Sequence, residues 1–320
     1  MRKIGVIANP QSWYNKYKLN ALSKIVRQYP DILYQEIKEF DHLITLLNNC
    51  ADHKVDLLVI SGGDGTVQAI LTLILNGQTN YKTPPLLAIL PGGRTNLIAL
   101  EIGLKGRLEK IFRTLSSEVN GAKNIITKPI LSVSVHPDHK PLFGLFLGMG
   151  AFTELTLMGR NKFHRWGLAK SLAILVTMIY FFIKLIFMPR SKSQDDVLRK
   201  YKIDFKANNN EFNTNPKFIF FVTTLNQLVY KMNPFWGQEK GFLRYLSIPY
   251  PPLNLLNSLW VVLRKKDKTQ LEQLGYISNC ATILECEIDN DFIIDGEIIK
   301  SFPNYPVKIK ADHQLKFVCF

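Results

Sequence analysis

Short apolar runs alternate with amphipathic stretches through the first third of the chain. Residues 55–60 form a run rich in Val, Ile and Leu, which is typical of a strand buried on both faces of a parallel sheet. From Val67 to Ile74 the apolar positions recur three and four residues apart, which predicts a helix with one packed face. Similar patterns predict strands over 3–8, 32–37 and 86–90, and helices over 17–29, 41–52, 97–100 and 106–115.

This alternation of strands and helices predicts a doubly wound parallel α/β sheet. From about residue 123 the pattern changes to short strands separated by turn residues, which predicts an all-β sandwich or barrel-like unit. A chain of 320 residues also exceeds the usual size of a single core. We therefore expect two domains, 1–122 and 123–320. The strands expected in the second are 130–135, 143–147, 201–205, 218–223, 243–248, 280–287, 292–294, 307–310 and 315–319.

An apolar helix is predicted to interrupt the second domain at residues 166–188, ahead of Pro189. Its length would suffice for a membrane span, but Lys170 and Lys184 interrupt it, and a span would separate strands of one domain. A core or interface helix is favoured, and its basic flanks and aromatic residues indicate contact with an anionic membrane surface. The apolar stretch 253–263, followed by the basic run 264–268, fits either a membrane contact or an ordinary amphipathic helix.

The formal charge of +14 and a pI near 9.5 indicate a polyanionic partner or surface. An anionic membrane, a nucleic acid or a phosphorylated substrate could each be this partner. Alternatively, the charge serves only to keep the protein soluble. The basic residues are scattered, so no nucleic-acid partner is expected. The N-terminal apolar run is too short for a signal peptide. Sparse cysteines without a C-x-x-C pair suit a reducing cytoplasm: Cys50, Cys280, Cys286 and Cys319.

The glycine-rich segment 62–66 follows the buried strand and opens a helix. Glycines let backbone amides approach an anion closely, and a helix start points unpaired donors at it, so the segment predicts a phosphate site. Asp64 complicates this interpretation, because a carboxylate beside a phosphate is repulsive unless it accepts backbone hydrogen bonds or neighbours a cation. The alternative is a tight turn in which Asp64 caps a helix.

A second glycine segment, 91–96, ends the next predicted strand. Pro91, Gly92 and Gly93 impose a turn, after which a cation, a hydroxyl and an amide suit phosphate or ribose. Ligands bind at the carboxyl ends of strands in doubly wound sheets. Both glycine segments and Asn9 are predicted to lie there. The three polar residues are Arg94, Thr95 and Asn96.

Residues 293–299 predict a strand, a turn and a strand, with Asp295 at the tip of the hairpin. Asp-Gly is a common two-residue hairpin turn, and local sequence alone favours that explanation. The alternative makes Asp295 a general base presented to the interdomain cleft, where it accepts the proton of an attacking hydroxyl. The segment 136–139 contains two histidines, but no further ligand is near in sequence, so we interpret it as a polar loop.

Taken together, these motifs resemble the diacylglycerol kinase catalytic-domain family. That family includes bacterial diacylglycerol kinases, sphingosine kinases, ceramide kinase and acylglycerol kinase, and it is more distantly related to NAD kinases. Residues 9–12 resemble its first-strand element, and 146–152 resemble its glycine-containing segment in the second domain. The resemblance spans nearly the whole chain and keeps the order of the motifs.

The resemblance implies a nucleotide-binding α/β domain and a β-sandwich that binds the lipid substrate, with the final strands folded back onto the first domain. It implies ATP and Mg²⁺ as cofactors, with Asp64 near the metal and Asp295 as the base that activates a lipid hydroxyl. Glu297 would assist at the nucleotide or metal. The residues implied in the ATP site are Asn9, Ser12, Gly62, Gly63, Asp64, Gly65, Thr66, Gly92, Gly93, Arg94, Thr95, Asn96 and Glu297.

The expected function is therefore phosphoryl transfer from ATP to a lipid hydroxyl, by a cytoplasmic enzyme peripheral to the inner membrane surface. A homodimer is compatible with the sequence. The alternatives are an NAD kinase-like small-molecule kinase and a catalytically inactive nucleotide- or lipid-binding relative. The last alternative is suggested by Leu97 and Lys240, which stand where soluble bacterial diacylglycerol kinases carry acidic residues, and Trp13 stands where many relatives carry glycine.

Overall fold

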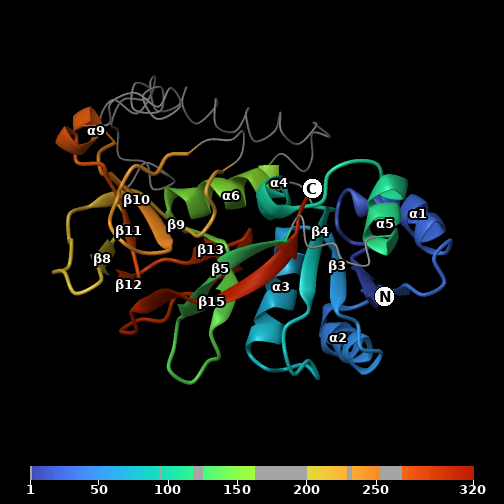
Figure 1. Cartoon of the computed structure of the whole chain (residues 1–320). Coiled ribbons are helices and arrows are strands. Elements are labelled where there is room, and N and C mark those ends of the chain that lie inside the picture. Colours follow the sequence, from blue (N-terminus) through green and yellow to red (C-terminus); the bar gives the residue numbers. More distant parts are fainter. Residues whose placement is uncertain (1, 94–95, 118–124, 163–199, 229–232, 253–268) are drawn as a thin grey trace. The chain divides into compact units, whose positions relative to one another are not determined.

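The computed structural model describes residues 2–93, 96–117, 125–162, 200–228, 233–252 and 269–320. The chain forms two compact units (Figure 1). The first unit comprises Met1–Ser132, Lys140–Leu145 and Asp312–Phe320, and the second comprises Val133–His139 and Phe146–Ala311. The domain boundary expected between residues 122 and 123 stays a prediction. The helix predicted at 166–188 and the stretch 253–268 lie outside the described residues.

The first unit contains a parallel sheet with the strand order β2-β1-β3-β4 and then β15. β5 pairs with β15 and β6. Its elements are β1 (Ile4–Ala8), α1 (Asn15–Val26), β2 (Leu33–Glu36), the 3₁₀ helix η1 (Phe40–His42), α2 (Leu43–Asp52), β3 (Leu57–Gly62), α3 (Asp64–Leu75), β4 (Leu86–Pro91), α4 (Leu97–Ile102), α5 (Leu108–Ser117) and β6 (Leu142–Gly144). β5 (Ile125–Ser134) and β15 (Val307–Val318) each run through both units.

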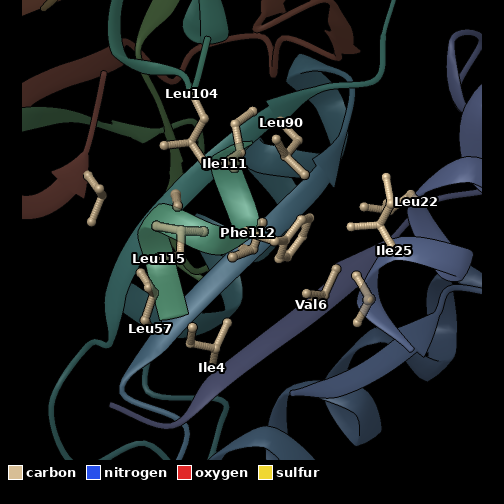
Figure 2. Packing of buried hydrophobic residues seen from close by; sticks show 14 of the residues in the cluster. Ile4, Val6, Leu22, Ile25, Leu57, Leu90, Leu104, Ile111, Phe112 and Leu115 are labelled. Carbon is tan, nitrogen blue, oxygen red and sulfur yellow. The ribbon is translucent and has the colours of Figure 1, made fainter. Parts of the chain in front are cut away.

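Helices cover both faces of this sheet. On one face, α1 and α5 pack their apolar residues against alternate positions of the strands, as Figure 2 shows for Leu22 and Ile25 of α1 and Phe112 of α5. On the other face, α2 lies over Gly5, where an added Cβ atom would be 3.2 Å from the Cys50 sulfur. The central strand β3 is buried along its whole length, as its uninterrupted apolar run predicts. The doubly wound α/β fold is thereby confirmed.

The second unit is built from antiparallel strands. One sheet has the order β11-β10-β9-β7-β13-β14, and in another β12 pairs with β8 and with the first part of β15. The Phe205 ring of β8 contacts the Phe220 ring of β9, with centroids 4.7 Å apart, so the two sheets face each other as in a sandwich. The elements are β7 (Phe146–Gly150), α6 (Ala151–Lys162), β8 (Ile203–Ala207), β9 (Lys217–Thr223), β10 (Leu243–Pro249), α9 (Thr269–Gln273), β11 (Ile277–Ala281), β12 (Ile283–Ile288), β13 (Phe292–Ile294) and β14 (Glu297–Ile299).

Several predicted boundaries in the second half of the chain were wrong. The strand expected at 280–287 is two strands, β11 and β12, which pair with different neighbours. The strand expected at 143–147 is also divided, between β6 and β7. The strands expected at 307–310 and 315–319 form one strand, β15. Helix α6 was not predicted from local pattern.

The return of the last strand to the first unit is confirmed, because Phe317 and Val318 of β15 pair in parallel with Leu87 and Ala88 of β4. Among the helices of the described residues, none combines the length and apolar character that a bilayer span requires.

Candidate nucleotide site

Three loops follow the parallel strands β1, β3 and β4, which are neighbours in the sheet of the first unit. Because parallel strands end at the same edge, these loops meet at the carboxyl edge, as expected. The register pairs Ala8 with Ser61 and Gly62 with Pro91, so Asn9 and both glycine segments follow strands that end level with one another.

The two glycine segments pack backbone against backbone. The Gly92 amide donates a hydrogen bond of 2.8 Å to the Gly62 carbonyl. A Cβ atom added at Gly92 would lie 2.9 Å from the Gly62 Cα atom, and one added at Gly93 would lie 2.4 Å from the Gly63 Cα atom. These glycines are therefore required by the contact between the loops. Part of the glycine content from which a phosphate site was predicted is therefore explained by the packing of the two loops, without any ligand.

A buried polar network joins the loop after β1 to the first glycine segment. The Asn9 amide donates to the Thr66 hydroxyl at 2.8 Å. The Asn15 amide donates to the carbonyls of Asn9 and Ser61, each at 2.9 Å, and the Ser61 hydroxyl donates to the Asn15 side-chain oxygen. Asn9 and Asn15 are both 4% exposed. Sequence reasoning identified Asn9 and Thr66 but missed Asn15, which lies two residues before the helix predicted at 17–29 and is the first residue of α1.

Two further polar side chains fix the backbone of the glycine segments. The Ser12 hydroxyl accepts a hydrogen bond of 3.2 Å from the Gly63 amide. The Asn96 side chain accepts from the Gly93 amide at 2.7 Å and donates to the Gly93 carbonyl at 3.0 Å. Asn96 itself adopts a left-handed backbone conformation with φ of 50°, which asparagine tolerates better than most residues. The intervening Arg94 and Thr95, both predicted site residues, lie outside the described residues.

Asp64 bonds the start of a different helix from the one it begins. Its two carboxylate oxygens accept hydrogen bonds from the amides of Leu97 and Ile98, at 3.0 and 3.1 Å. These are the first two amides of α4, so Asp64 caps that helix across 33 residues of sequence. Burial raises the pKa of Asp64 to about 6, and the two amides act in the opposite direction. A carboxylate is tolerated beside the glycine loops because it accepts these donors.

The amide donors available at the two helix starts differ. Asp64 occupies the first amides of α4, whereas within the described ranges no hydrogen bond is found from the amides of Asp64 and Gly65 at the start of α3. α3 has 12 residues, enough for its aligned peptide dipoles to favour an anion at this end. The start of α3 is therefore the better place for a phosphate group.

Asp295 and Glu297 belong to the second unit, where β13, the Asp295-Gly296 pair and β14 form a two-residue hairpin. The φ angles of 47° at Asp295 and 90° at Gly296 are those of the predicted turn. Asp295 is 4% exposed. Its carboxylate accepts a 2.9 Å hydrogen bond from the Phe146 amide, while its own amide donates to the Phe146 carbonyl. Glu297 is exposed on β14.

The described residues contain no group of three or more His, Cys, Asp or Glu side chains arranged to hold a metal ion. Residues 136–139 form no helix or strand, which agrees with their interpretation as a polar loop, and His136 contacts the rings of Phe302 and Tyr305.

The first unit is an α/β domain whose two glycine loops and open helix start are suited to a phosphorylated ligand. Residues 3–126 match the family model of the diacylglycerol kinase catalytic domain. Over these residues, rather more than a third of the chain, the protein is therefore similar to the diacylglycerol kinase catalytic domain.

The fold is also shared with solved structures. One, a provisionally named diacylglycerol kinase from Bacillus anthracis str. Sterne, has a TM-score of 0.67 and 16% sequence identity, and the match covers 100% of this chain and 97% of that one. A second structure, named as a diacylglycerol kinase from the same organism, has a TM-score of 0.61 and 13% identity, with 99% and 96% covered. No curated protein matches the chain. At such identities the structures establish the fold alone.

Proposed function

We propose that the protein is a lipid kinase that transfers the γ-phosphate of ATP, with Mg²⁺, to a hydroxyl group of a diacylglycerol-like or related lipid. The observation that carries the proposal is the start of α3, where the amides of Asp64 and Gly65 face no acceptor in the described residues and follow two interlocked glycine loops. Its supporting context is the family match over residues 3–126.

In this proposal the first unit binds the nucleotide. The amides at the start of α3 donate to the phosphates of ATP, and the side-chain network of Asn9, Ser12 and Thr66 holds the loop in shape before the nucleotide arrives. Gly62, Gly63, Gly92 and Gly93 allow the loops to meet. The family resemblance implies a role at the nucleotide for Arg94, Thr95, Asn96 and Glu297 as well.

Asp64 has a donor set that fits magnesium arriving with the nucleotide. Each carboxylate oxygen accepts one amide, which leaves lone pairs for a cation, and Mg²⁺ in kinases is usually held by one or two carboxylates together with phosphate oxygens. Bound there, the ion would neutralise charge on the transferred phosphoryl group. Asp64 is held in place for this role because it begins α3 and its carboxylate accepts the first amides of α4.

Asp295 is proposed as the base. The lipid hydroxyl oxygen forms a bond to the γ-phosphorus, the bond from that phosphorus to the β–γ bridging oxygen breaks, and the hydroxyl proton passes to the Asp295 carboxylate. ADP leaves with the bridging oxygen. The basic composition, with a net charge of +14, supports a cytoplasmic protein that binds peripherally to the anionic inner surface of the membrane.

The test is transfer of labelled γ-phosphate from Mg-ATP to mixed micelles that contain diacylglycerol, monoacylglycerol, ceramide or sphingoid base, with NAD as a soluble acceptor. Asp295→Asn is the informative variant, because asparagine keeps an oxygen for the Phe146 amide and tolerates the left-handed turn, while it removes the base. We expect a labelled lipid with wild type and at least a hundredfold slower transfer with Asp295→Asn. Equal transfer by both proteins would remove Asp295 from the mechanism.

A second candidate is a nucleotide-binding protein that does not transfer phosphate. It is favoured by the hydrogen bonds that already engage both candidate acidic groups, Asp64 with α4 and Asp295 with Phe146. Saturable ATP binding without any labelled lipid or labelled NAD would support this candidate over the kinase.

A further inference from the structure

A row of polar side chains runs along one face of α3. Gln68, Thr72 and the C-terminal cap residue Asn76 recur at intervals of four residues, so their side chains lie one above another. Gln68 is 7% exposed and Thr72 is half-buried. Buried polar groups are kept where they make hydrogen bonds, so this row indicates a fixed partner for α3.

The partner is the segment that leads into and forms β6. The Asn76 side-chain amide donates to the Pro141 carbonyl at 2.9 Å. The Thr72 hydroxyl accepts from the Phe143 amide at 3.0 Å and donates to the Phe143 carbonyl at 3.4 Å. The Gln68 side-chain amide donates to the same hydroxyl at 3.4 Å. Thr72 therefore bonds both backbone groups of Phe143, as a residue of a neighbouring antiparallel strand does.

Phe143 is held from its other sides as well. Its side chain is 1% exposed, its ring meets the His313 ring edge to face with centroids 4.9 Å apart, and β6 pairs with β5. The contacts of Phe143 with Thr72 and with His313 both lie inside the first unit. The position of the Phe143 backbone is thus fixed relative to α3.

Three residues further on, the same stretch of chain holds Asp295. Phe146 is the first residue of β7 and belongs to the second unit. Its amide donates to the Asp295 carboxylate at 2.9 Å, and its carbonyl accepts from the Asp295 amide at 2.9 Å. Beside it, Leu147 pairs with Ile294. The direction of the Asp295 carboxylate therefore depends on where the Phe146 backbone lies.

We propose that Thr72 is a positioning residue for Asp295, and that it acts through the linking segment Phe143–Phe146. Each end of this segment offers its amide and its carbonyl to one partner, which is Thr72 in the first unit and Asp295 in the second. Two residues separate the ends, and a chain this short transmits a displacement from one end to the other. The inference rests on the proposed function, because that function makes Asp295 the base and the start of α3 the phosphate site.

Phosphoryl transfer gives this coupling a purpose. A general base must hold its oxygen within hydrogen-bond reach of the reacting hydroxyl, and a displacement of about 1 Å costs on the order of a hundredfold in rate. Thr72 lies about two turns after the start of α3. In the proposed mechanism, the helix that holds the phosphates therefore also fixes the backbone that holds the base. The alternative is that Thr72 only secures the packing of β6 on α3.

The test compares three variants of the full chain. Thr72→Val removes the hydroxyl with little change of shape, and Thr72→Ser keeps the hydroxyl as the conservative variant. Thr79→Val is the matched control, since Thr79 is half-buried in the same unit and its hydroxyl makes no hydrogen bond within the described residues. Thermal unfolding of each variant shows whether it is folded at the temperature of the assays.

The first measurement is amide hydrogen exchange without ATP, at Phe143, Phe146 and Asp295. We expect Thr72→Val to speed exchange about tenfold at all three amides, and Thr72→Ser and Thr79→Val to stay within about twofold of wild type. Faster exchange at Phe143 alone would overturn the inference, because Thr72 would then secure only β6.

The second measurement is the single-turnover rate of γ-phosphate transfer at saturating Mg-ATP. Thr72→Val should slow transfer about tenfold while the Kd for ATP stays within about twofold of wild type, and Thr72→Ser should restore the rate. Added to Asp295→Asn, Thr72→Val should slow the residual transfer less than about twofold, because the group that it positions is gone. Equal losses in both backgrounds, or the same loss in Thr79→Val, would overturn the inference.

Failure of the proposed function would give a different result. If wild type transfers no phosphate to any lipid, the kinase proposal falls, and the exchange measurement alone decides whether Thr72 positions Asp295. Coupled exchange at the three amides would then support that role for Thr72, and unchanged exchange would overturn it.

Discussion

Gly93 lies directly against Gly63, so closely that a Cβ atom on Gly93 would be 2.4 Å from the Gly63 Cα atom. The reverse contact is looser, since a Cβ atom on Gly63 would lie 3.1 Å from the Gly93 Cα atom. Two segments separated by one helix and one strand thus share a single backbone contact. The two glycines are unequal partners in it.

Replacing Gly93 with alanine should force the two loops apart. We expect Gly93→Ala to lower the free energy of unfolding by about 1–3 kcal/mol, as overpacking does, and to weaken ATP binding. Gly63→Ala is the matched control, and its looser contact should cost less than Gly93→Ala. Urea unfolding and ATP titration of both variants measure the order, and equal losses would show that the loops adjust independently of this contact.

Asp64 should protect the first amides of α4 from exchange with solvent. In EDTA and without nucleotide, Asp64→Ala should speed hydrogen exchange at Leu97 and Ile98 and cost about 1 kcal/mol of stability, because both acceptors are lost. Asp64→Asn keeps one acceptor and should fall between wild type and alanine. Unchanged exchange at both amides would mean that Asp64 does not cap α4.

The opposite end of α4 carries a buried ion pair. The Lys128 ammonium bonds the Glu101 carboxylate, and both side chains are largely buried. Lys128→Met should destabilise the protein by about 3 kcal/mol, since it removes the cation from beside a buried carboxylate. Lys128→Met/Glu101→Met should recover much of that loss. If the double variant lost as much free energy of unfolding as Lys128→Met and Glu101→Met lose in sum, the two side chains would not be coupled.

Lys217 predicts a stability change at alkaline pH. Its side chain is 2% exposed and donates to the Asn213 side chain at 2.7 Å and to the Asn215 carbonyl. Burial lowers its pKa to about 8, against a weaker opposite effect of Asp204. Between pH 8 and the ordinary lysine pKa, the unfolded chain therefore binds more protons than the folded chain, and stability should rise with pH.

The measurement is the free energy of unfolding of wild type relative to Lys217→Met from pH 7 to about 10.5. The difference should shift in favour of wild type by on the order of 1–3 kcal/mol across this range. A flat difference would mean that Lys217 keeps an ordinary pKa in the folded protein.

Much of the fold was predictable because it is encoded locally. The apolar run before Gly62 specifies the central strand β3, and the Pro-Gly-Gly turn specifies where β4 ends. Together they predict that the two glycine segments lie on neighbouring strands, which the register of β3 and β4 confirms. The Asp295-Gly296 hairpin was predicted for the same reason, since the turn depends on two adjacent residues.

What escaped prediction depends on contacts distant in sequence. Asn15 bonds carbonyls 6 and 46 residues away, so nothing beside it marks it as part of the site. The cap that Asp64 provides lies on α4, not on α3. β15 appeared to be two strands because Asp312 and Gln314 interrupt its apolar pattern, although the strand continues through them.

β15 has a consequence for biosynthesis. One edge of β4 pairs with β3, but its other edge pairs with Phe317 and Val318, which are translated long after it and after nearly all of the second unit. Until then one edge of β4 in the nascent first unit has no partner strand. An unpaired edge of an apolar strand is a template for pairing with other chains. Folding of the first unit therefore cannot finish cotranslationally in the order in which its strands emerge from the ribosome, and a fragment ending at residue 126 would keep that edge open permanently.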